Sequence, residues 1–313
     1  MLTEDSSLQK VALIYGGRGA EAEVSKVTVK AFAKALEELG EEFVQIEADE
    51  DLPVKLKQLN PKLALLAVHG KYSEDGTLQG LCEYLKIPYT GSGVLASALS
   101  FDKVYCKNLF EKNNIPTAKF QSLDLHQQEI SKFTLELSFP VVVKPSREGS
   151  SIGVSIVNNQ QELVSALKLA AQYDNNILIE KFIEGKEVTI PILKGKTLES
   201  VEIAPKQGFY NYENKYQAGK TNYILPANVE KRTLERLKEI TIEACQLLKV
   251  RSYARVDFML DKNENPYIME VNTLPGCTPT SLVPKAAAHA GIEFKEFIRQ
   301  IMEEATLDYE GLK

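Results

Sequence analysis

The segment from residue 253 to residue 276, YARVDFMLDKNENPYIMEVNTLPG, constrains the fold more than any other part of the chain. It contains two runs of apolar and β-branched residues, 254–260 and 267–271, which is a composition typical of β-strands. The residues between these runs, 261–265, are polar and include one Asp and two Asn, which favour turns. The segment therefore predicts a β-hairpin.

The register of this hairpin is expected to bring four polar side chains together. If the turn is symmetric about the bond between residues 263 and 264, Asp257 lies opposite Glu270 and Arg255 lies opposite Asn272. Side chains alternate between the two faces of a strand, so all four would share one face.

Two carboxylates directly opposite each other on neighbouring strands repel. Asp257 and Glu270 must therefore share a proton, pair with a base or hold a cation. The all-oxygen set that they form with Asn272 suits a hard ion such as magnesium. A solvated face with a cross-strand Arg–Asp pair is the alternative, and spacing alone leaves both interpretations open.

The length, the net charge, the N-terminal pattern and the cysteine spacing limit the classes of protein to which this chain can belong. A chain of 313 residues is too long for one ordinary core, which predicts two or three domains. A net charge of -6 argues against nucleic-acid and anionic-membrane partners, and no apolar run approaches the length of a membrane span. The N-terminus lacks the pattern of a secretion signal, and the four cysteines are scattered without Cys-x-x-Cys spacing. We expect a cytoplasmic protein with reduced thiols.

The first third of the chain has a β-turn-α-β order. Apolar patterning predicts a strand, a helix and two further strands at residues 10–15, 21–39, 43–47 and 63–68. This order predicts an open parallel sheet, in which ligands bind beyond the carboxyl ends of the strands. Gly16, Gly17 and His69 are therefore expected to line one crevice.

Residues 17–22 also fit the dinucleotide fingerprint G-x-G-x-x-G/A, which would favour a nicotinamide-dependent oxidoreductase. Against this, Glu21 and Glu23 place two acids where a pyrophosphate needs a helix N-terminus. Glu23 is explained by the helix dipole alone. Glu21 is a candidate to bind the ammonium group of a small ligand.

The middle of the chain carries a second candidate site. Residues 139–157, FPVVVKPSREGSSIGVSIV, predict two strands around a small Gly/Ser-rich loop at 146–151. Such a loop offers N–H groups and hydroxyls to anionic oxygens, and Lys144 can meet a phosphate. An exposed hairpin turn is the alternative.

Residues 205–228 show no clear period and carry several tyrosines, which suggests an ordered lid loop.

Nine motifs in chain order together resemble the D-alanine–D-alanine ligases, which are ATP-grasp enzymes: AEAEVS, HGKYSEDGTLQG, PYTGSG, KPSREGSSIGV, ILIEKFIEGKEVT, FYNYENKY, ARVDFML, MEVNTLPG and SLVP. The resemblance spans residues 11–291. It implies an α/β ATP-grasp fold with an N-terminal open parallel α/β domain and two α+β domains that clasp ATP. The implied boundaries are 1–93 for the Rossmann-like substrate domain, 94–185 for the central subdomain, and 186–313 for the C-terminal subdomain with the metal site and the lid.

The resemblance implies ATP as co-substrate and two Mg²⁺ or Mn²⁺ ions. Lys103 and Lys144 would contact the ATP phosphates. Adenine and ribose would be surrounded by Glu180, Lys181, Ile183 and Glu187. The metal ligands would be Asp257, Glu270 and Asn272.

The resemblance also implies which residues serve the amino acids. Arg255 and the backbone N–H of Gly276 would hold the developing oxyanion. Glu21 would take the ammonium group of the first D-alanine, and Lys215 would reach the transferred phosphate. The remaining assignments are a hydrogen-bonded triad of Ser150, Tyr216 and Glu21, and substrate binding by His69, Ser281 and Leu282.

The implied activity is ATP-dependent joining of two D-alanines through an acyl phosphate, for peptidoglycan synthesis, by a homodimer. A D-alanine–D-lactate ligase is the nearest alternative, and the pair Lys215 and Tyr216 resembles the dipeptide-forming type. An oxidoreductase would leave Asp257, Glu270 and Asn272 without a purpose. A non-catalytic ATP-binding module would leave Arg255 and Glu21 unused.

Overall fold

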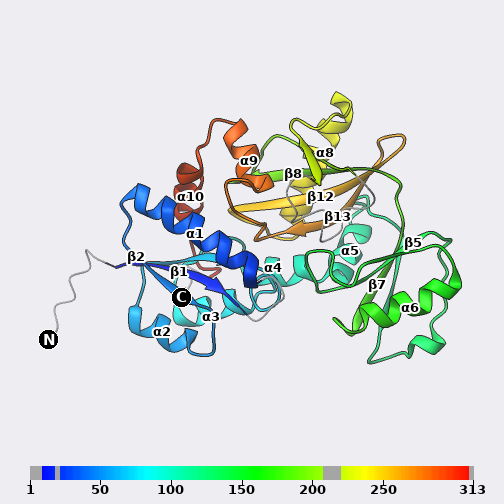
Figure 1. Cartoon of the computed structure of the whole chain (residues 1–313), viewed down its shortest axis with the longest axis horizontal. Coiled ribbons are helices and arrows are strands. Elements are labelled where there is room, and N and C mark those ends of the chain that lie inside the picture. Colours follow the sequence, from blue (N-terminus) through cyan, green and yellow to red (C-terminus); the bar gives the residue numbers. More distant parts are fainter. Residues whose placement is uncertain (1–8, 18–21, 207–219, 310–313) are drawn as a thin grey trace.

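The computed structural model describes residues 9–17, 22–206 and 220–309. Three β-sheets with their covering helices make up this part of the chain (Figure 1). Glu21, Lys215 and Tyr216, to which the sequence assigned roles, lie outside the described residues, as does most of the predicted lid.

The first sheet is parallel, with the order β2-β1-β3, and this confirms the prediction for the N-terminal region. Its strands are β1 (Val11–Gly16), β2 (Phe43–Glu47) and β3 (Leu63–Val68). The crossover helices are α1 (Ala22–Leu39) and α2 (Leu52–Leu59), and α3 (Thr77–Leu85) follows β3. β1 and β3 are almost entirely buried, as continuous apolar runs in parallel sheets usually are.

The last two helices return to this N-terminal core. They are α9 (Leu282–His289) and α10 (Phe294–Glu303), and Figure 1 shows α10 beside α1. Phe297 of α10 is fully buried and meets Tyr253 edge-to-face, with ring centroids 5.7 Å apart. The two ends of the chain therefore share one hydrophobic core.

Two short helices lead to the second sheet. They are α4 (Val94–Phe101) and α5 (Lys103–Lys112), and the Asp102 side chain caps α5 by accepting from the N–H groups of Val104 and Tyr105. This cap fixes the start of α5, so that Lys103 is the first helical residue.

The second sheet is antiparallel, with the order β4-β7-β5-β6. Its strands are β4 (Phe120–Asp124), β5 (Val141–Pro145), β6 (Ser155–Val157) and β7 (Asn176–Lys181), and α6 (Gln160–Ala170) packs on it. A short 3-10 helix, η2 (Ile130–Lys132), lies in the β4–β5 connection. The two strands predicted around the Gly/Ser-rich loop are present and paired.

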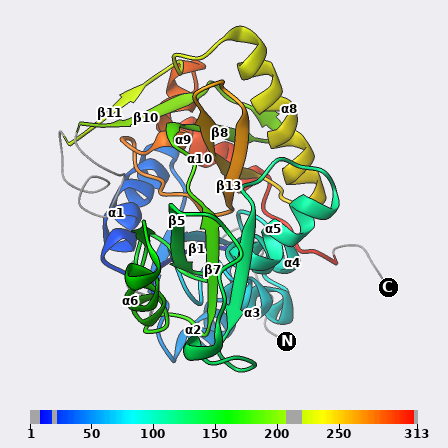
Figure 2. The same ribbon diagram turned by 90° about the vertical axis from the view of Figure 1, so that its right-hand side faces the viewer.

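The third sheet has the order β11-β10-β8-β12-β13, with β9 added to β8. Its strands are β8 (Gly185–Leu193), β9 (Lys196–Thr197), β10 (Val201–Pro205), β11 (Thr221–Ile224), β12 (Tyr253–Asp261) and β13 (Pro266–Asn272). The helix α8 (Lys231–Leu247) packs against its apolar face. Figure 2 shows β8 and β13 of this sheet above β5 and β7 of the second sheet.

The predicted hairpin is β12–β13, and its register is confirmed. Asp257 lies opposite Glu270, and Arg255 lies opposite Asn272. The turn itself differs from the prediction, because the pairing shifts after Asp257 and Phe258 lies opposite Ile268. A β-bulge takes up the extra residue. The true turn is therefore centred on Asn263, and the bulge restores the predicted pairing at the polar positions.

One part of the region between residues 205 and 228 is more regular than the sequence indicated. Residues 221–224 form β11, which pairs antiparallel with β10. A four-residue strand at the sheet edge, with two side chains partly buried and two exposed, is too short to be recognised by its period. In the described parts of the chain, no helix has both the length and the apolar character needed to cross a membrane.

Candidate active site

Two adjoining cavities lie where the three sheets meet. One, of about 590 Å³, is lined by β5, β7, β10 and the β12–β13 hairpin. The other, of about 540 Å³, lies between the N-terminal region and the segment 271–282. Six residues line both cavities: Lys103, Glu148, Gly149, Ser150, Arg255 and Glu270. A molecule in one cavity can therefore meet a molecule in the other at this junction.

The hairpin supplies the polar wall of the first cavity. The Asp257 carboxylate is 3% exposed and accepts hydrogen bonds from Arg255 Nε at 2.8 Å and Arg255 Nη2 at 2.7 Å. Thr189 Oγ1 donates to it at 2.6 Å and Asn272 Nδ2 at 2.9 Å. Each Asp257 oxygen thus accepts two hydrogen bonds, and the Asp257 and Arg255 side chains are buried, so the alternative of a solvated face is wrong.

Pairing with bases relieves the predicted repulsion between the two hairpin carboxylates. Asp257 pairs with Arg255 on its own strand, not across the hairpin, and Glu270 lies 3.2 Å from Lys103 Nζ. The sequence left a shared proton, pairing with a base and holding a cation as alternatives, and these two ion pairs are pairing with a base. Lys103 also donates to the carbonyl of Glu148 at 2.7 Å, which ties α5 to the Gly/Ser-rich loop.

The same residues fit a hard cation by chemistry. Within the described residues, no three His, Cys, Asp or Glu side chains form a metal-binding group. The hairpin does bring two carboxylates and one amide onto one face. Magnesium commonly takes only one or two carboxylates from the protein and completes its shell with water and phosphate oxygens. This donor set suits an ion that arrives with a phosphate ligand.

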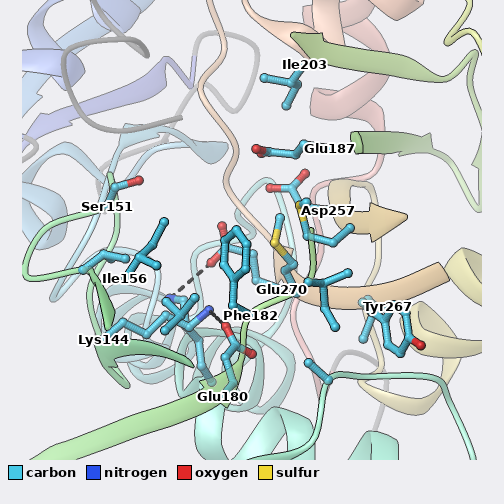
Figure 3. A pocket seen from close by; sticks show the side chains of 18 of the residues that line it. Lys144, Ser151, Ile156, Glu180, Phe182, Glu187, Ile203, Asp257, Tyr267 and Glu270 are labelled. Carbon is cyan, nitrogen blue, oxygen red and sulfur yellow. Dashed lines mark ion pairs between the residues drawn. The ribbon is translucent and has the colours of Figure 1, made fainter. Parts of the chain in front are cut away.

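The floor of the first cavity holds the Glu180 carboxylate between two lysines, and Figure 3 shows one of them, Lys144, beside it. Glu180 Oε1 is 2.5 Å from Lys144 Nζ, and Glu180 Oε2 is 2.8 Å from Lys107 Nζ. Burial raises the pKa of Glu180, but the charges of Lys107 and Lys144 lower it more strongly, so that this pKa is about 2. Glu180 therefore stays ionised at neutral pH. Lys107 was not predicted, because a lysine on a helix is normally solvated.

This arrangement predicts a contribution of Glu180 to acid stability. The folded pKa of about 2 lies below the ordinary glutamate pKa of 4.5, so the stabilisation is present above about pH 5 and is lost as the pH falls toward 2. We expect it to reach about 3 kcal/mol in the free energy of unfolding. Urea unfolding at several pH values should show a steeper acid loss for the wild type than for Glu180→Gln. Equal slopes would show that the carboxylate is not ionised between the lysines.

The other predicted nucleotide contacts line the first cavity. Lys181, Ile183 and Glu187 lie along the β7–β8 segment, and Figure 3 shows Glu187 across the cavity from Glu180. The Lys181 ammonium group donates to the carbonyls of Ser138 and Phe139 at 2.9 and 3.2 Å. The ammonium group of Lys181 is therefore hydrogen-bonded to backbone carbonyl groups.

The second cavity holds the predicted amino-acid contacts. It is lined by His69, Ser150, Gly276, Ser281 and Leu282, and also by Asn272, which was predicted as a metal ligand. His69 is buried, with Nε2 3.0 Å from Thr28 Oγ1 and Nδ1 3.5 Å from Glu74 Oε1. Gly17 lines a different hollow, with residues 47–51, so the prediction that Gly17 and His69 share one crevice is wrong. The two residues follow neighbouring strands, since Gly16 of β1 pairs with Val68 of β3, but they line different hollows.

The Gly/Ser-rich loop carries left-handed backbone at two non-glycine residues. The φ angles of Ser150 and Ser151 are 51° and 59°. Such backbone is uncommon outside glycine and clusters at ligand-binding sites. Both serines line the first cavity, which agrees with the predicted anion-binding loop and not with an exposed turn.

Two antiparallel sheets that enclose a cavity, with lysines on one side and a carboxylate-bearing hairpin on the other, define an ATP-grasp fold. The chain matches the sequence model of the D-ala D-ala ligase C-terminus over residues 109–303 and that of the D-ala D-ala ligase N-terminus over residues 44–92. The chain therefore belongs to the D-alanine–D-alanine ligase family.

Individual relatives agree with this assignment. The D-alanine–D-alanine ligase of Syntrophotalea carbinolica is 41% identical over 98% of this chain and 99% of its own. That of Citrifermentans bemidjiense is 43% identical over the same shares. The crystal structure of the Bacillus anthracis enzyme in complex with ATP superposes with a TM-score of 0.83 at 35% identity, covering 95% of this chain and 97% of that one. The predicted resemblance and fold are confirmed, and the oxidoreductase interpretation is not supported.

Proposed function

We propose that this protein joins two D-alanine molecules into D-alanyl-D-alanine at the expense of ATP, for peptidoglycan synthesis. The observation that carries the proposal is the junction of the two cavities at Lys103, Arg255 and Glu270. A nucleotide in the first cavity would present its terminal phosphate there, and an amino acid in the second would present its carboxylate.

The reaction needs such a junction because a carboxylate is a poor electrophile. The carboxylate of the first D-alanine attacks the terminal phosphorus of ATP, which forms an acyl phosphate and releases ADP. The neutral amine of the second D-alanine then attacks the acyl carbon. The tetrahedral intermediate expels inorganic phosphate, and the amine nitrogen loses its extra proton.

The described residues divide between these two steps. Lys103 and Lys144 would hold the ATP phosphates, since phosphoryl transfer depends mainly on positioning and charge neutralisation. Arg255 and the Gly276 N–H would donate to the oxyanion of the second step. Ser281 and Leu282, at the start of α9, would hold the carboxylate of the second D-alanine, and His69 would line the pocket of the first.

Asp257, Glu270 and Asn272 would hold magnesium or manganese ions. Bound there, the ions would neutralise the charge of the phosphates. The roles of Glu21, Lys215 and Tyr216 remain predictions of the sequence. We also propose the three-domain division at residues 93 and 185, a homodimer and a cytoplasmic location.

The test is phosphate release from ATP with D-alanine, with L-alanine and with no amino acid. We expect release, together with the dipeptide, only with D-alanine. Equal release with L-alanine would refute the substrate assignment. In competition at neutral pH, a product dominated by the D-lactate ester would favour the D-alanine–D-lactate alternative.

A further inference from the structure

Lys107 is a fully buried cation directly behind the wall of the first cavity. It lies one helical turn after Lys103 on α5, and its side chain is 0% exposed. Its ammonium group is 2.8 Å from Glu180 and donates to Thr117 Oγ1 at 2.5 Å. Lys107 lines neither cavity. A buried ammonium group costs free energy unless it is well paired, so a neutral residue would be expected here unless the charge has a use.

The Glu180 carboxylate is shared between two lysines that face different surroundings. Lys144 binds one oxygen and lines the cavity, whereas Lys107 binds the other oxygen from the protein interior. Two cations against one carboxylate leave one positive charge in excess. Because only Lys144 reaches the cavity, the excess charge is available to a ligand there.

This excess matters because the cavity wall is not otherwise basic. Carboxylates outnumber cationic side chains among its lining residues. If Lys107 carried no charge, Glu180 and Lys144 would form a neutral pair. The cavity would then attract a polyanion less strongly, although every residue in contact with the ligand would be unchanged.

We propose that Lys107 is a positioning residue of the nucleotide site, whose charge balances Glu180 so that Lys144 presents an uncompensated positive charge to the phosphates of ATP. This proposal rests on the nucleotide site of the proposed function. It assigns Lys107 no contact with substrate.

A purely structural role would have a different signature. Thr117 Oγ1, which accepts from Lys107, donates to the carbonyl of Ile268 at 2.9 Å and so links α5 to β13. Loss of this link would disturb the whole cavity and weaken base and phosphate binding together. Loss of the Lys107 charge, in contrast, would weaken the binding of phosphates only. Burial lowers the pKa of Lys107, and the Glu180 carboxylate opposes part of this lowering.

The experiment compares ATP with adenosine, which has the base and ribose but no phosphate. Dissociation constants are measured by calorimetry with magnesium and without amino acid, for wild type and Lys107→Met. We expect ATP affinity to fall on the order of tenfold in Lys107→Met, with adenosine affinity unchanged. Thr117→Val is the matched control, because it removes the hydrogen bond and keeps the charge. It should leave the ratio of ATP to adenosine affinity at the wild-type value.

A double variant provides the decisive comparison. Lys107→Met with Glu180→Gln removes both buried charges and leaves Lys144 uncompensated, so the ATP-to-adenosine ratio should return toward wild type. If Lys107→Met alone does not fold, the double variant is compared with Glu180→Gln, and the ratio should be lower in the double variant. Equal losses for ATP and adenosine, or no loss for ATP, would overturn the proposal. Failure of the wild type to bind ATP would instead refute the nucleotide site.

Discussion

Glu270→Gln is expected to lower kcat on the order of a thousandfold while the protein remains folded. Glu270 lines both cavities, and it is the one hairpin carboxylate whose ion pair, with Lys103, spans the junction between them. Glutamine has the same shape but no charge. It would weaken both the proposed metal site and the alignment of Lys103 with the phosphates.

Stability should change little in this variant. The Glu270 side chain is 26% exposed, and a single ion pair of this kind contributes about 1 kcal/mol or less. The measurements are phosphate release at saturating ATP and D-alanine, and thermal unfolding with and without magnesium. Glu264→Gln is the matched control in the hairpin turn, since Glu264 lines neither cavity, and it should retain activity. Normal magnesium-dependent turnover by Glu270→Gln would contradict the metal site.

The part of the site that the sequence predicted best is the part that depends on local rules. Pairing of Asp257 with Glu270 follows from the period of two along a strand and from turn chemistry. The bulge after Asp257 could not be predicted, because no local pattern marks it: the extra residue is on β13, while β12 pairs with β8 in unbroken register. The prediction succeeded because the displaced turn centre and the bulge cancel at the polar positions.

Features that depend on distant partners were missed. β4 and β11 are short, partly polar edge strands, and they are strands only because β7 and β10 lie beside them. Lys107 is buried because Glu180 and Thr117 come from other elements. No local pattern distinguishes it from a solvated lysine. The pairing of Asp257 with Arg255, instead of with a cation alone, likewise depends on the burial of these two side chains by other elements.

Arg255→Met is expected to destabilise the protein by about 3–5 kcal/mol and to lower kcat by about a hundredfold or more. Arg255 is 9% exposed, and its Nε and Nη2 groups donate to the two oxygens of Asp257. Without the guanidinium, the buried Asp257 carboxylate keeps, in the described part of the chain, only the neutral donors Thr189 and Asn272. The loss of activity follows from the proposed oxyanion role, and the loss of stability follows from an unpaired buried charge.

Magnesium separates these two causes. In the wild type the Arg255 guanidinium already balances Asp257, so an added ion must share that carboxylate. In Arg255→Met the carboxylate has no other ion-pair partner among the described residues, so magnesium should raise Tm more in the variant than in the wild type. Arg236→Met, which removes an exposed arginine of α8 paired with Glu239, should change neither Tm nor its response to magnesium. If magnesium raised the Tm of Arg255→Met and of wild type equally, Asp257 would not be a metal ligand. Arg255 would then remain the charged partner of Asp257 throughout the reaction.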